Sequence, residues 1–245
     1  MSRLRAAAIH LLICAGVALV LLALFWLVWY PPPLFQAVGG VEIFLMLLGI
    51  DVILGPLLTL IVFKSGKKTL KFDLAVIGAV QVAALCYGVF TLLSGRPVYV
   101  AALGHRFDVI QANEIEEKEL EAAKQSLPWF GPRWVGTKSA NDAKEKERIM
   151  FSAMGGADYG HFPQHHQPLE NMRDEILKNA EYLYQLKKHN AGNEAAIDGW
   201  LAERGLKPDQ VRFQGLKGRS RDFTVVLDGT TAKVLGVAPF KPWAQ

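Results

Sequence analysis

Cysteine is scarce in this chain of 245 residues, and the two that are present, Cys14 and Cys86, both lie in apolar runs. Two isolated cysteines exclude a disulfide framework and give no indication of the redox compartment. We expect both to act as small apolar side chains buried among their neighbours.

Sequence signatures of catalysis are missing as well. The chain has no GxSxG elbow, no P-loop, no GxGxxG after a strand and no HExxH pair. The sequence therefore predicts a protein that is not an enzyme, with no catalytic residue, no cofactor and no metal site.

Acidic side chains are rare in the first 96 residues, which hold seven basic and three acidic residues, whereas the remainder holds 20 of each. A basic excess often indicates a nucleic-acid partner. Here the basic residues flank long apolar runs instead, so we expect no nucleic-acid binding and a lipid bilayer as the surrounding medium.

Three apolar runs are long enough to cross a bilayer as helices, which takes about 20 residues. They cover about 6–30, 41–63 and 74–93. The first is longer than the apolar region of a signal peptide, and it ends in Trp29, Tyr30 and three prolines instead of a cleavage site. We expect an uncleaved anchor with its aromatic end at the membrane interface.

Basic residues predict the orientation of these spans. Arg3 and Arg5 precede the first span, and the loop "KSGKKTLK" between the second and third spans carries four lysines. Positive loops stay in the cytoplasm. The sequence thus predicts a multi-pass protein of a bacterial inner membrane: residues 1–96 form three transmembrane α-helices with a cytoplasmic N-terminus, and residues 97–245 form a periplasmic domain.

The periplasmic part reads as an α+β domain. "PVYVAAL" and "RFDVIQA" are rich in β-branched and aromatic residues, and "RDFTVVLDGTTAKVLGVAPF" is typical of a hairpin that turns at Asp228–Gly229. "PWFGPRWVGT", with two prolines, reads as an irregular or edge segment. We expect strands at both ends of the domain, helices between them, and pairing of the first strand with the last.

The middle of this domain predicts four helices. "EIEEKELEAAKQ" is a short exposed helix, and 141–154 is a helix capped by Asn141. Residues 169–189 read as one amphipathic helix, and 193–204 as another that ends at Gly205. The apolar face of the third helix consists of Met172, Ile176, Ala180, Leu183 and Leu186.

Three polar clusters in this domain are candidate sites. His161, His165 and His166 resemble a metal set, but Pro163 interrupts their spacing, which favours an ordinary polar loop. "GLKGRSRD" could hold a phosphate or a lipid headgroup, although a tight turn before the hairpin is favoured. A run of carboxylates is most simply a solvated helix face; its members are Glu114, Glu116, Glu117, Glu119 and Glu121.

The sharpest question concerns Asp51 in the second span, because a carboxylate at the bilayer centre costs roughly 2.5–3.5 kcal/mol. Gln81 of the third span is within reach if the helices tilt, and Thr59 lies two turns along the same helix as Asp51, so an interhelical hydrogen bond is one reading. The other is a polar notch for a further membrane helix, in which Gly55 permits close approach and Pro56 weakens the helix. An ion site is also conceivable, although three spans make a poor transporter.

Segments along nearly the whole chain resemble the TfpX/TfpZ family of type IV pilin accessory proteins. Although His105 stands where that family's pattern has an acidic residue, order and spacing both fit. The matching segments are "WYPPPLFQAVGGVEIFLMLLGIDVILGPLLTLIVFKSGKKTLKFDLAVI", "RPVYV", "HRFDVIQANEI", "GPRWVG" and "LKGRSRDFTVVLDGTTAKVLGVAPFKPW".

The resemblance implies a non-enzymatic, pilin-specific chaperone or assembly modulator that engages its cognate type IV pilin in the membrane and periplasm, with a possible contact to the assembly platform. We expect partner binding by Glu42, Asp51, Gly55, Pro56 and Gln81. Glu42 needs only solvation or a lipid contact near the outer interface. A membrane-anchored periplasmic enzyme that modifies pilin, and a structural subunit of the pilus or secretion machinery, remain alternatives.

Overall fold

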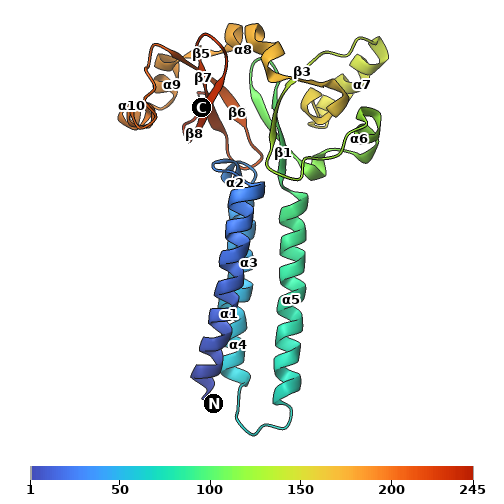
Figure 1. Ribbon diagram of the computed structural model, residues 1–245, viewed down its shortest axis with the longest axis vertical. Helices are drawn as coiled ribbons and strands as arrows, with labels where there is room; N and C mark the ends of the chain where they lie inside the picture. The colour runs from blue at the N-terminus through green and yellow to red at the C-terminus, as the bar shows by residue number, and fades with distance from the viewer. Residues whose placement is uncertain (1, 245) are drawn as a thin grey trace.

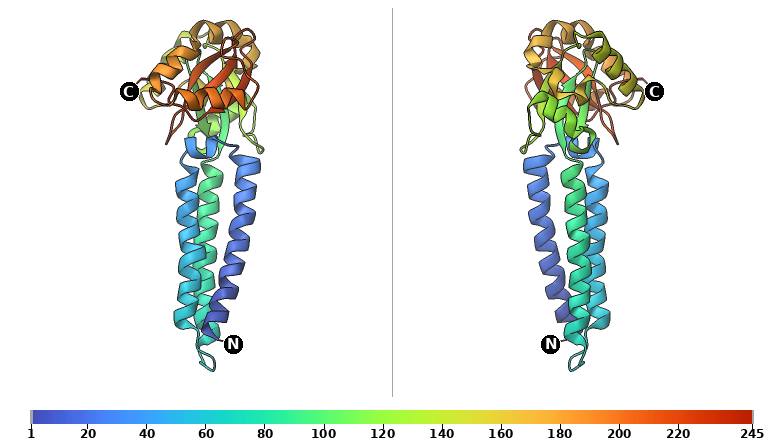
Figure 2. Two further views of the ribbon diagram at one scale, coloured as in Figure 1. Left: turned by 90° about the vertical axis from the view of Figure 1, so that its left-hand side faces the viewer. Right: turned by 90° about the vertical axis from the view of Figure 1, so that its right-hand side faces the viewer.

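The computed structural model describes residues 2–244, which form a long helical bundle carrying a head at one end (Figures 1 and 2). Three helical stretches, Arg3–Trp29, Gly40–Val62 and Leu70–Ser94, are long and apolar enough to cross a membrane. They agree with the three runs predicted from the sequence. We call them the first, second and third apolar helices.

The first two apolar helices each contain a widened turn. Directly before Pro56, which has no backbone N–H for the carbonyl of Val52, the Gly55 N–H bonds to the Ile50 carbonyl five residues back. Such π-type turns often mark functional sites. The elements of the bundle are α1 (Arg3–Leu24), η1 (Phe25–Trp29), α2 (Leu34–Ala37), α3 (Gly40–Leu48), η2 (Gly49–Leu54), α4 (Gly55–Val62) and α5 (Leu70–Ser94).

The first and third apolar helices pack mainly against the second; in Figure 1 α1 overlaps the second helix and α5 stands beside it. The N-terminus and the lysine loop lie together at the end of the bundle far from the head (Figure 2). Cys86 is exposed on the outside of the bundle and Cys14 is half-buried, so the expected burial of both cysteines is wrong for Cys86.

The head is built on a mixed sheet in the order β4-β3-β1-β2-β6-β7-β8, with β5 paired to β6. α5 leads almost directly into β1, so β1 runs away from the bundle (Figure 1). The strands are β1 (Pro97–Ala102), β2 (Phe107–Gln111), β3 (Arg133–Thr137), β4 (His166–Gln167), β5 (Glu181–Tyr182), β6 (Val211–Lys217), β7 (Phe223–Asp228) and β8 (Val234–Ala238).

The predicted pairing of the first strand with the last is wrong. β1 lies between β2 and β3, and β8 pairs with β7 at the end of the sheet. The strand that joins the two halves is β6, which the sequence reading missed and which pairs in parallel with β2. A parallel pair needs a long crossover, and here about a hundred residues separate its strands. The hairpin of β7 and β8, which turns at Asp228–Gly229, is confirmed.

Helices and short 3-10 turns cover the sheet (Figure 2). The N-cap of α7 is Asp142, whose carboxylate accepts from the Glu145 N–H, and not Asn141 as predicted. Gly205 follows α10 with a positive φ of 64°, as expected of a helix C-terminus. The helical elements are η3 (Ala112–Glu114), α6 (Glu117–Ala123), α7 (Ala143–Met154), η4 (Tyr159–His161), η5 (Pro163–His165), η6 (Leu169–Met172), α8 (Arg173–Asn179), α9 (Leu183–His189) and α10 (Glu194–Ala202).

The single helix predicted over 169–189 is wrong. It breaks at Ala180, whose ψ of 133° is extended, and the next two residues form β5 against β6. The Tyr182 N–H then bonds to the Gln185 side chain at the start of α9. The break keeps the apolar positions inside: Met172, Ile176, Ala180, Leu183 and Leu186 are all buried.

One hydrophobic core runs from the sheet into the top of the bundle. Phe25 and Tyr30, at the end of the first apolar helix, share this core with Phe107 and Phe223 of the sheet. Hydrogen bonds fix the same junction. The Ala37 carbonyl accepts from the N–H groups of Ser220 (2.8 Å) and Arg221 (3.3 Å), the Val28 carbonyl from Gly131 (2.8 Å), and the Trp129 carbonyl from the Trp29 indole (3.1 Å).

A charged cluster joins α6 to α7. Arg148 donates to Glu119 at 2.7 and 3.0 Å and to Glu145 at 2.7 and 2.8 Å. Glu119 is 4% exposed, so the expectation that the whole carboxylate run is solvated is wrong at this position. The Arg148 guanidinium lowers the pKa of Glu145 from 4.5 to about 2.

This cluster predicts acid sensitivity of the head. A carboxyl whose pKa is lowered by folding stabilises the fold above its unfolded pKa, and that stability is lost as pH falls through the folded pKa. For Glu145 the window runs from about 4.5 down to about 2. In Glu145→Gln the midpoint of thermal unfolding should fall less over this range than in wild type, as followed by circular dichroism. Glu147→Gln, on an exposed position of the same helix, should match wild type; equal acid slopes in all three proteins would contradict the prediction.

Candidate functional site within the helical bundle

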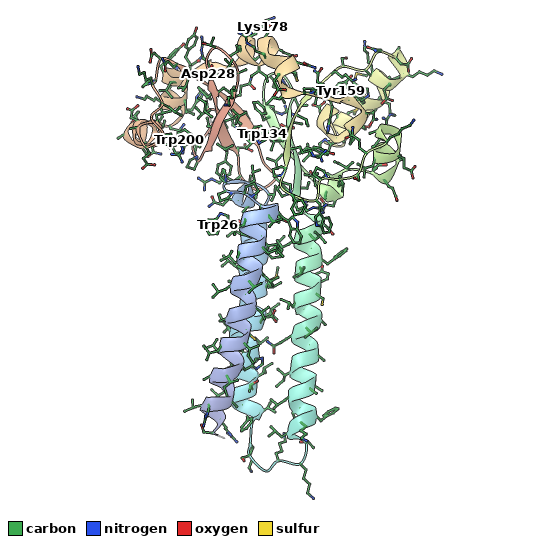
Figure 3. All side chains as sticks on the ribbon, viewed as in Figure 1. Trp26, Trp134, Tyr159, Lys178, Trp200 and Asp228 are labelled. Atoms are coloured by element: carbon green, nitrogen blue, oxygen red, sulfur yellow. The ribbon has the colours of Figure 1, made fainter. Side chains whose placement is uncertain are left out.

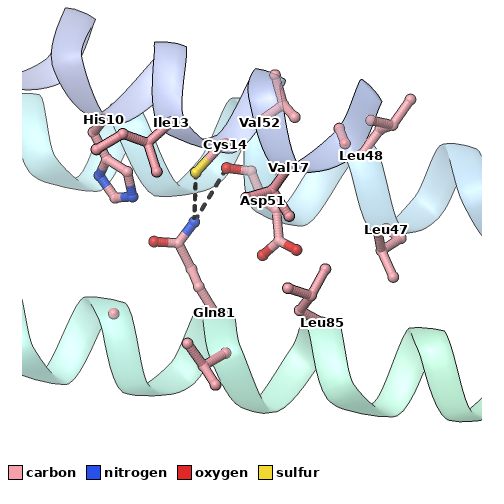
Figure 4. Close-up of a pocket in the computed structure, with 13 residues that line it drawn as sticks. His10, Ile13, Cys14, Val17, Leu47, Leu48, Asp51, Val52, Gln81 and Leu85 are labelled. Atoms are coloured by element: carbon pink, nitrogen blue, oxygen red, sulfur yellow. Dashed lines mark hydrogen bonds between the residues drawn. The ribbon is translucent and has the colours of Figure 1, made fainter. Parts of the chain in front are cut away.

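A cavity of about 190 Å³ lies among the three apolar helices (Figure 4). Its walls are almost entirely aliphatic, and four side chains in it can form polar contacts: His10, Cys14, Asp51 and Gln81. Each apolar helix contributes at least one of these four. The cavity is lined by His10, Ile13, Cys14, Val17, Ala18, Leu47, Leu48, Asp51, Val52, Gly78, Gln81, Val82 and Leu85.

Asp51 is the most unusual group in this cavity. Its side chain is only 8% exposed, and within residues 2–244 neither carboxylate oxygen has a hydrogen-bond partner. Figure 4 shows the carboxylate turned toward α5, near Gln81 and Leu85. A buried carboxylate without a partner is strongly unfavourable, and buried polar groups in folded proteins are normally satisfied. The widened turn η2 therefore presents an acceptor to the cavity that the chain itself leaves unused.

Gln81 bridges the three helices beside Asp51. Its amide nitrogen donates to the backbone carbonyl of Asp51 at 3.1 Å and lies 3.7 Å from the sulfur of Cys14, while its amide oxygen has no partner within residues 2–244. Asp51 and Gln81 do meet, as the sequence suggested. The hydrogen bond, however, reaches the carbonyl of Asp51, and the carboxylate stays unpaired.

Gly55 and Pro56 are buried one turn farther along the second helix. A Cβ added at Gly55 would lie 2.0 Å from the amide nitrogen of Gln81, so the missing side chain makes room for Gln81. The Gln81 side chain thus occupies the space beside Gly55 that was predicted to admit a partner helix. The part of the predicted notch that stays open is the cavity in front of the Asp51 carboxylate.

Glu42 does not join this group. It precedes Asp51 by nine residues, roughly 13 Å along the helix axis. It lines a separate cavity of about 500 Å³ at the junction with the head, next to Arg219 and Ser220. The five residues predicted as one binding set therefore divide into Asp51 with Gln81, Gly55 and Pro56 deep in the bundle, and Glu42 at its upper end.

Sequence reasoning missed the polar contact on the first apolar helix. His10 Nδ1 lies 2.6 Å from the hydroxyl of Thr59, which is 3% exposed. A signal for this contact was present, because His10 is the one clearly polar side chain within 6–30. The expected interhelical hydrogen bond at Asp51 is the one that Gln81 donates to the Asp51 carbonyl. Thr59, two turns along the same helix as Asp51, pairs instead with His10 of the first apolar helix.

The polar clusters of the head have local partners. His161 Nδ1 accepts from the Asp158 N–H (3.1 Å), His165 Nε2 lies 3.1 Å from a carboxylate oxygen of Glu145, and His166 Nε2 lies 2.9 Å from the Gly160 carbonyl. Among residues 2–244, no group of three or more His, Cys, Asp or Glu side chains is arranged to hold a metal ion. "GLKGRSRD" ends β6 and turns into β7, with the Gly218 N–H bonded to Asp222 (3.1 Å).

Comparison with known proteins gives this architecture a family. A relative named "Fimbrial assembly protein, serogroup I" from Dichelobacter nodosus is 30% identical over 227 residues, which cover 90% of this chain and 88% of the relative. This chain belongs to the fimbrial assembly protein family. The serogroup E1 protein of the same organism is 29% identical over the same shares, and the family described as "Fimbrial assembly protein FimB" matches residues 1–39.

A third relative, "Fimbrial assembly protein, serogroups C1 and C2", is 33% identical over 117 residues, which cover 47% of this chain and 89% of that protein. No solved structure matches the chain. Membership of the fimbrial assembly protein family supports a role in fimbria or pilus biogenesis.

The contact between His10 and Thr59 gives a prediction for this fimbrial assembly protein. Thr59→Val keeps the branched shape and removes the hydroxyl, which should lower the stability of the bundle by about 0.6 kcal/mol and by no more than about 1.7 kcal/mol. Thermal unfolding in detergent measures the change. Thr91→Val is a matched control, because the Thr91 hydroxyl bonds only to the Tyr87 carbonyl within its own helix. A loss at Thr91 equal to that at Thr59 would show that the interhelical bond has no special weight.

Proposed function

We propose that this chain is a non-enzymatic, multi-pass protein of the bacterial inner membrane that holds a fimbrial subunit, a type IV pilin, during assembly. The observation that carries the proposal is the unpaired Asp51 carboxylate in a cavity between α1 and α5. The similarity to fimbrial assembly proteins supports a role in the assembly of fimbriae or pili. The resemblance to TfpX/TfpZ proteins supports a pilin-specific accessory role.

The packing of the bundle supports docking of a further helix. Because α1 and α5 pack mainly on the second apolar helix, they form the two walls of a groove whose floor carries Asp51. Ile13 and Val17 on α1 and Val82 on α5 line this groove and are exposed. A helix of the partner would cover these side chains and bring a fourth helix to the bundle. We call this surface the membrane groove.

Asp51 would supply the polar contact in the membrane groove. Hydrogen bonds to an ionised acceptor are about twice as strong as those between neutral groups, and water does not compete for them in an apolar cavity. An ammonium, amide or hydroxyl donor on the incoming helix would satisfy the carboxylate, so a helix that carries such a donor at the right depth is favoured over a purely aliphatic one.

The orientation of the chain would let it contact both the membrane helix and the periplasmic part of such a partner. With Arg3, Arg5 and the lysine loop in the cytoplasm, the head stands in the periplasm directly above the membrane groove (Figure 1). A reporter enzyme that is active only in the periplasm, fused after the C-terminus, tests this orientation, since activity confined to the cytosol would overturn it.

Site-specific crosslinking tests the docking itself. A photo-crosslinking amino acid in place of Val82 points into the membrane groove, whereas one in place of Val80, also exposed but not lining the cavity, serves as the matched control. In cells that make fimbriae, Val82 should trap the fimbrial subunit and Val80 should not. A Val82 position that traps no subunit would refute the proposal, and capture of the assembly platform instead would favour a structural subunit of that machinery.

A further inference from the structure

A second cavity, of about 640 Å³, opens where the head meets the end of the first apolar helix. Two strands from opposite ends of the sheet line it, β3 through Trp134 and β8 through Val234–Val237. β3 is second from one end of the sheet and β8 is last at the other, with β1, β2, β6 and β7 between them. The sheet must therefore curl for both to reach one cavity. We call this cavity the strand slot; Figure 3 shows Trp134 in the middle of the head, above the bundle.

Both strands that line the strand slot have an edge, or part of one, that no other strand within residues 2–244 pairs with. β8 pairs only with β7, and β3 pairs with β1 on one side and with β4 only at Gly136 and Thr137. The strand order places nothing beyond β8 or beside the first half of β3 within residues 2–244. Unpaired strand edges are templates for pairing with another chain.

The directions of the two edges suit a single added strand. β1 runs away from the bundle, and β3 is parallel to it. β2 and β6 run toward the bundle, β7 away from it, and β8 toward it again. A segment that rises from the membrane would thus run antiparallel to β8, the more stable arrangement, and parallel to β3.

The lining of the strand slot restricts the chemistry of its occupant. It holds no charged side chain, and its volume lies in the range of roughly 300–1,000 Å³ that is usual for binding pockets. Its floor is the end of the first apolar helix, so an occupant enters at the membrane surface. The lining residues are Leu27, Val28, Pro31, Pro32, Pro33, Leu34, Phe130, Gly131, Pro132, Trp134, Val234, Leu235, Gly236 and Val237.

We propose that the strand slot binds an extended, uncharged segment of the fimbrial subunit, which adds a strand between β8 and β3 and closes the curled sheet. This proposal rests on the function proposed above, because it is the subunit's membrane helix that would deliver the segment. Main-chain hydrogen bonds to the two edges provide affinity, and the apolar lining selects uncharged side chains.

A lipid chain or a second copy of this protein fits these observations less well. Lipid has no backbone donors or acceptors to satisfy the edges of β3 and β8. In a second copy, the matching edges are recessed in its own strand slot above its own bundle. A segment of the fimbrial subunit that follows a helix docked in the membrane groove would begin at the level of the strand slot. It would run away from the bundle, antiparallel to β8.

Crosslinking from the mouth of the slot tests the proposal in cells that make fimbriae. Phe130 lines the slot and is 76% exposed, whereas Tyr184 on α9 is 67% exposed and lies outside it. A photo-crosslinking phenylalanine in place of Phe130 should trap the fimbrial subunit, and the same amino acid in place of Tyr184 should not. Peptide mapping should place the crosslink outside the membrane helix of the subunit.

Substitution at the edge of β8 provides the second arm. Val234→Lys places a charge on the free edge and should reduce the Phe130 crosslink roughly tenfold, because a charged edge blocks strand addition. Val234→Thr keeps the branched shape without charge and should retain the crosslink. Circular dichroism shows that each variant is folded.

The outcomes separate this proposal from the proposed function. Crosslinks to the subunit from Val82 but not from Phe130 would overturn strand addition and leave docking in the membrane groove intact. If neither Val82 nor Phe130 gives a crosslink to the subunit, both strand addition and docking in the membrane groove are refuted. A Phe130 crosslink to a second copy of this chain would assign the strand slot to self-association, and one to lipid alone would assign it to the bilayer; either result refutes the proposal.

Discussion

Asp51→Leu should produce a protein that is more stable than wild type and unable to support fimbriation. On insertion scales a leucine at the centre of a membrane helix is favoured over an aspartate by roughly 3 kcal/mol. In the wild type, neither carboxylate oxygen has a partner among residues 2–244 to offset that difference. The midpoint of thermal unfolding in detergent should therefore rise. Because the same carboxylate is the proposed contact for the subunit, surface fimbriae should fall at least about tenfold, the loss that 1.4 kcal/mol of binding energy produces.

The opposite signs of these two effects make the test sharp. A residue whose role is only structural loses stability and function together, whereas Asp51 should gain one and lose the other. Asp51→Asn removes the charge but keeps an acceptor, and should retain more fimbriation than Asp51→Leu. Immunoblots confirm equal amounts of protein. If Asp51→Leu cells display normal fimbriae, the carboxylate plays no part in assembly.

Gly218→Ala should loosen the head from the bundle. A Cβ at this position would lie 2.2 Å from the Arg221 carbonyl and 2.6 Å from the Ala37 carbonyl, and neither backbone atom can rotate away as a side chain could. The loop between β6 and β7 must then move, which breaks the two hydrogen bonds that Ser220 and Arg221 donate to Ala37. Overpacking of this kind costs about 1–3 kcal/mol, which lowers the unfolding midpoint by roughly 5 °C.

Proteolysis should locate this effect. In Gly218→Ala, cleavage within 31–39 should become faster, because Ala37 loses the loop that covers it. Gly199→Ala is the matched control, since an added Cβ meets nothing within 4 Å in α10 and alanine favours a helix. An unchanged cleavage rate in Gly218→Ala would show that the loop does not hold the junction.

The three apolar helices could be predicted from the sequence because their signal is local: length, hydropathy and flanking charge are read from the chain directly. The hairpin at Asp228–Gly229 was predictable for the same reason. β6 was not, because the alternation of apolar and polar residues in "VRFQGLK" lasts only from Val211 to Gln214 and its parallel partner β2 lies far away in the sequence. Parallel pairing between strands that lie far apart in the chain produces no recognisable pattern in the sequence of either strand.

The break at Ala180 shows how tertiary contacts override a helical pattern. The apolar spacing over 169–189 is correct as a list of buried residues, yet β6 needs a short antiparallel partner, and β5 supplies it. The site was partly predictable in the same sense. The sequence pointed to Asp51 and Gln81 as neighbours, but it could not show that the Gln81 amide bonds to the Asp51 carbonyl within the widened turn η2 and not to the carboxylate.

Only Gly95 and Arg96 separate the last residue of α5 from the first residue of β1. The Arg96 carbonyl is bonded to Ala112, and its guanidinium donates to the Leu93 carbonyl, so this joint is braced from both sides. We therefore expect a displacement of the third apolar helix to move β1 with it. In the proposed membrane orientation, a helix that docks against α5 would therefore displace β1 as well, and the head would respond to occupancy of the bundle.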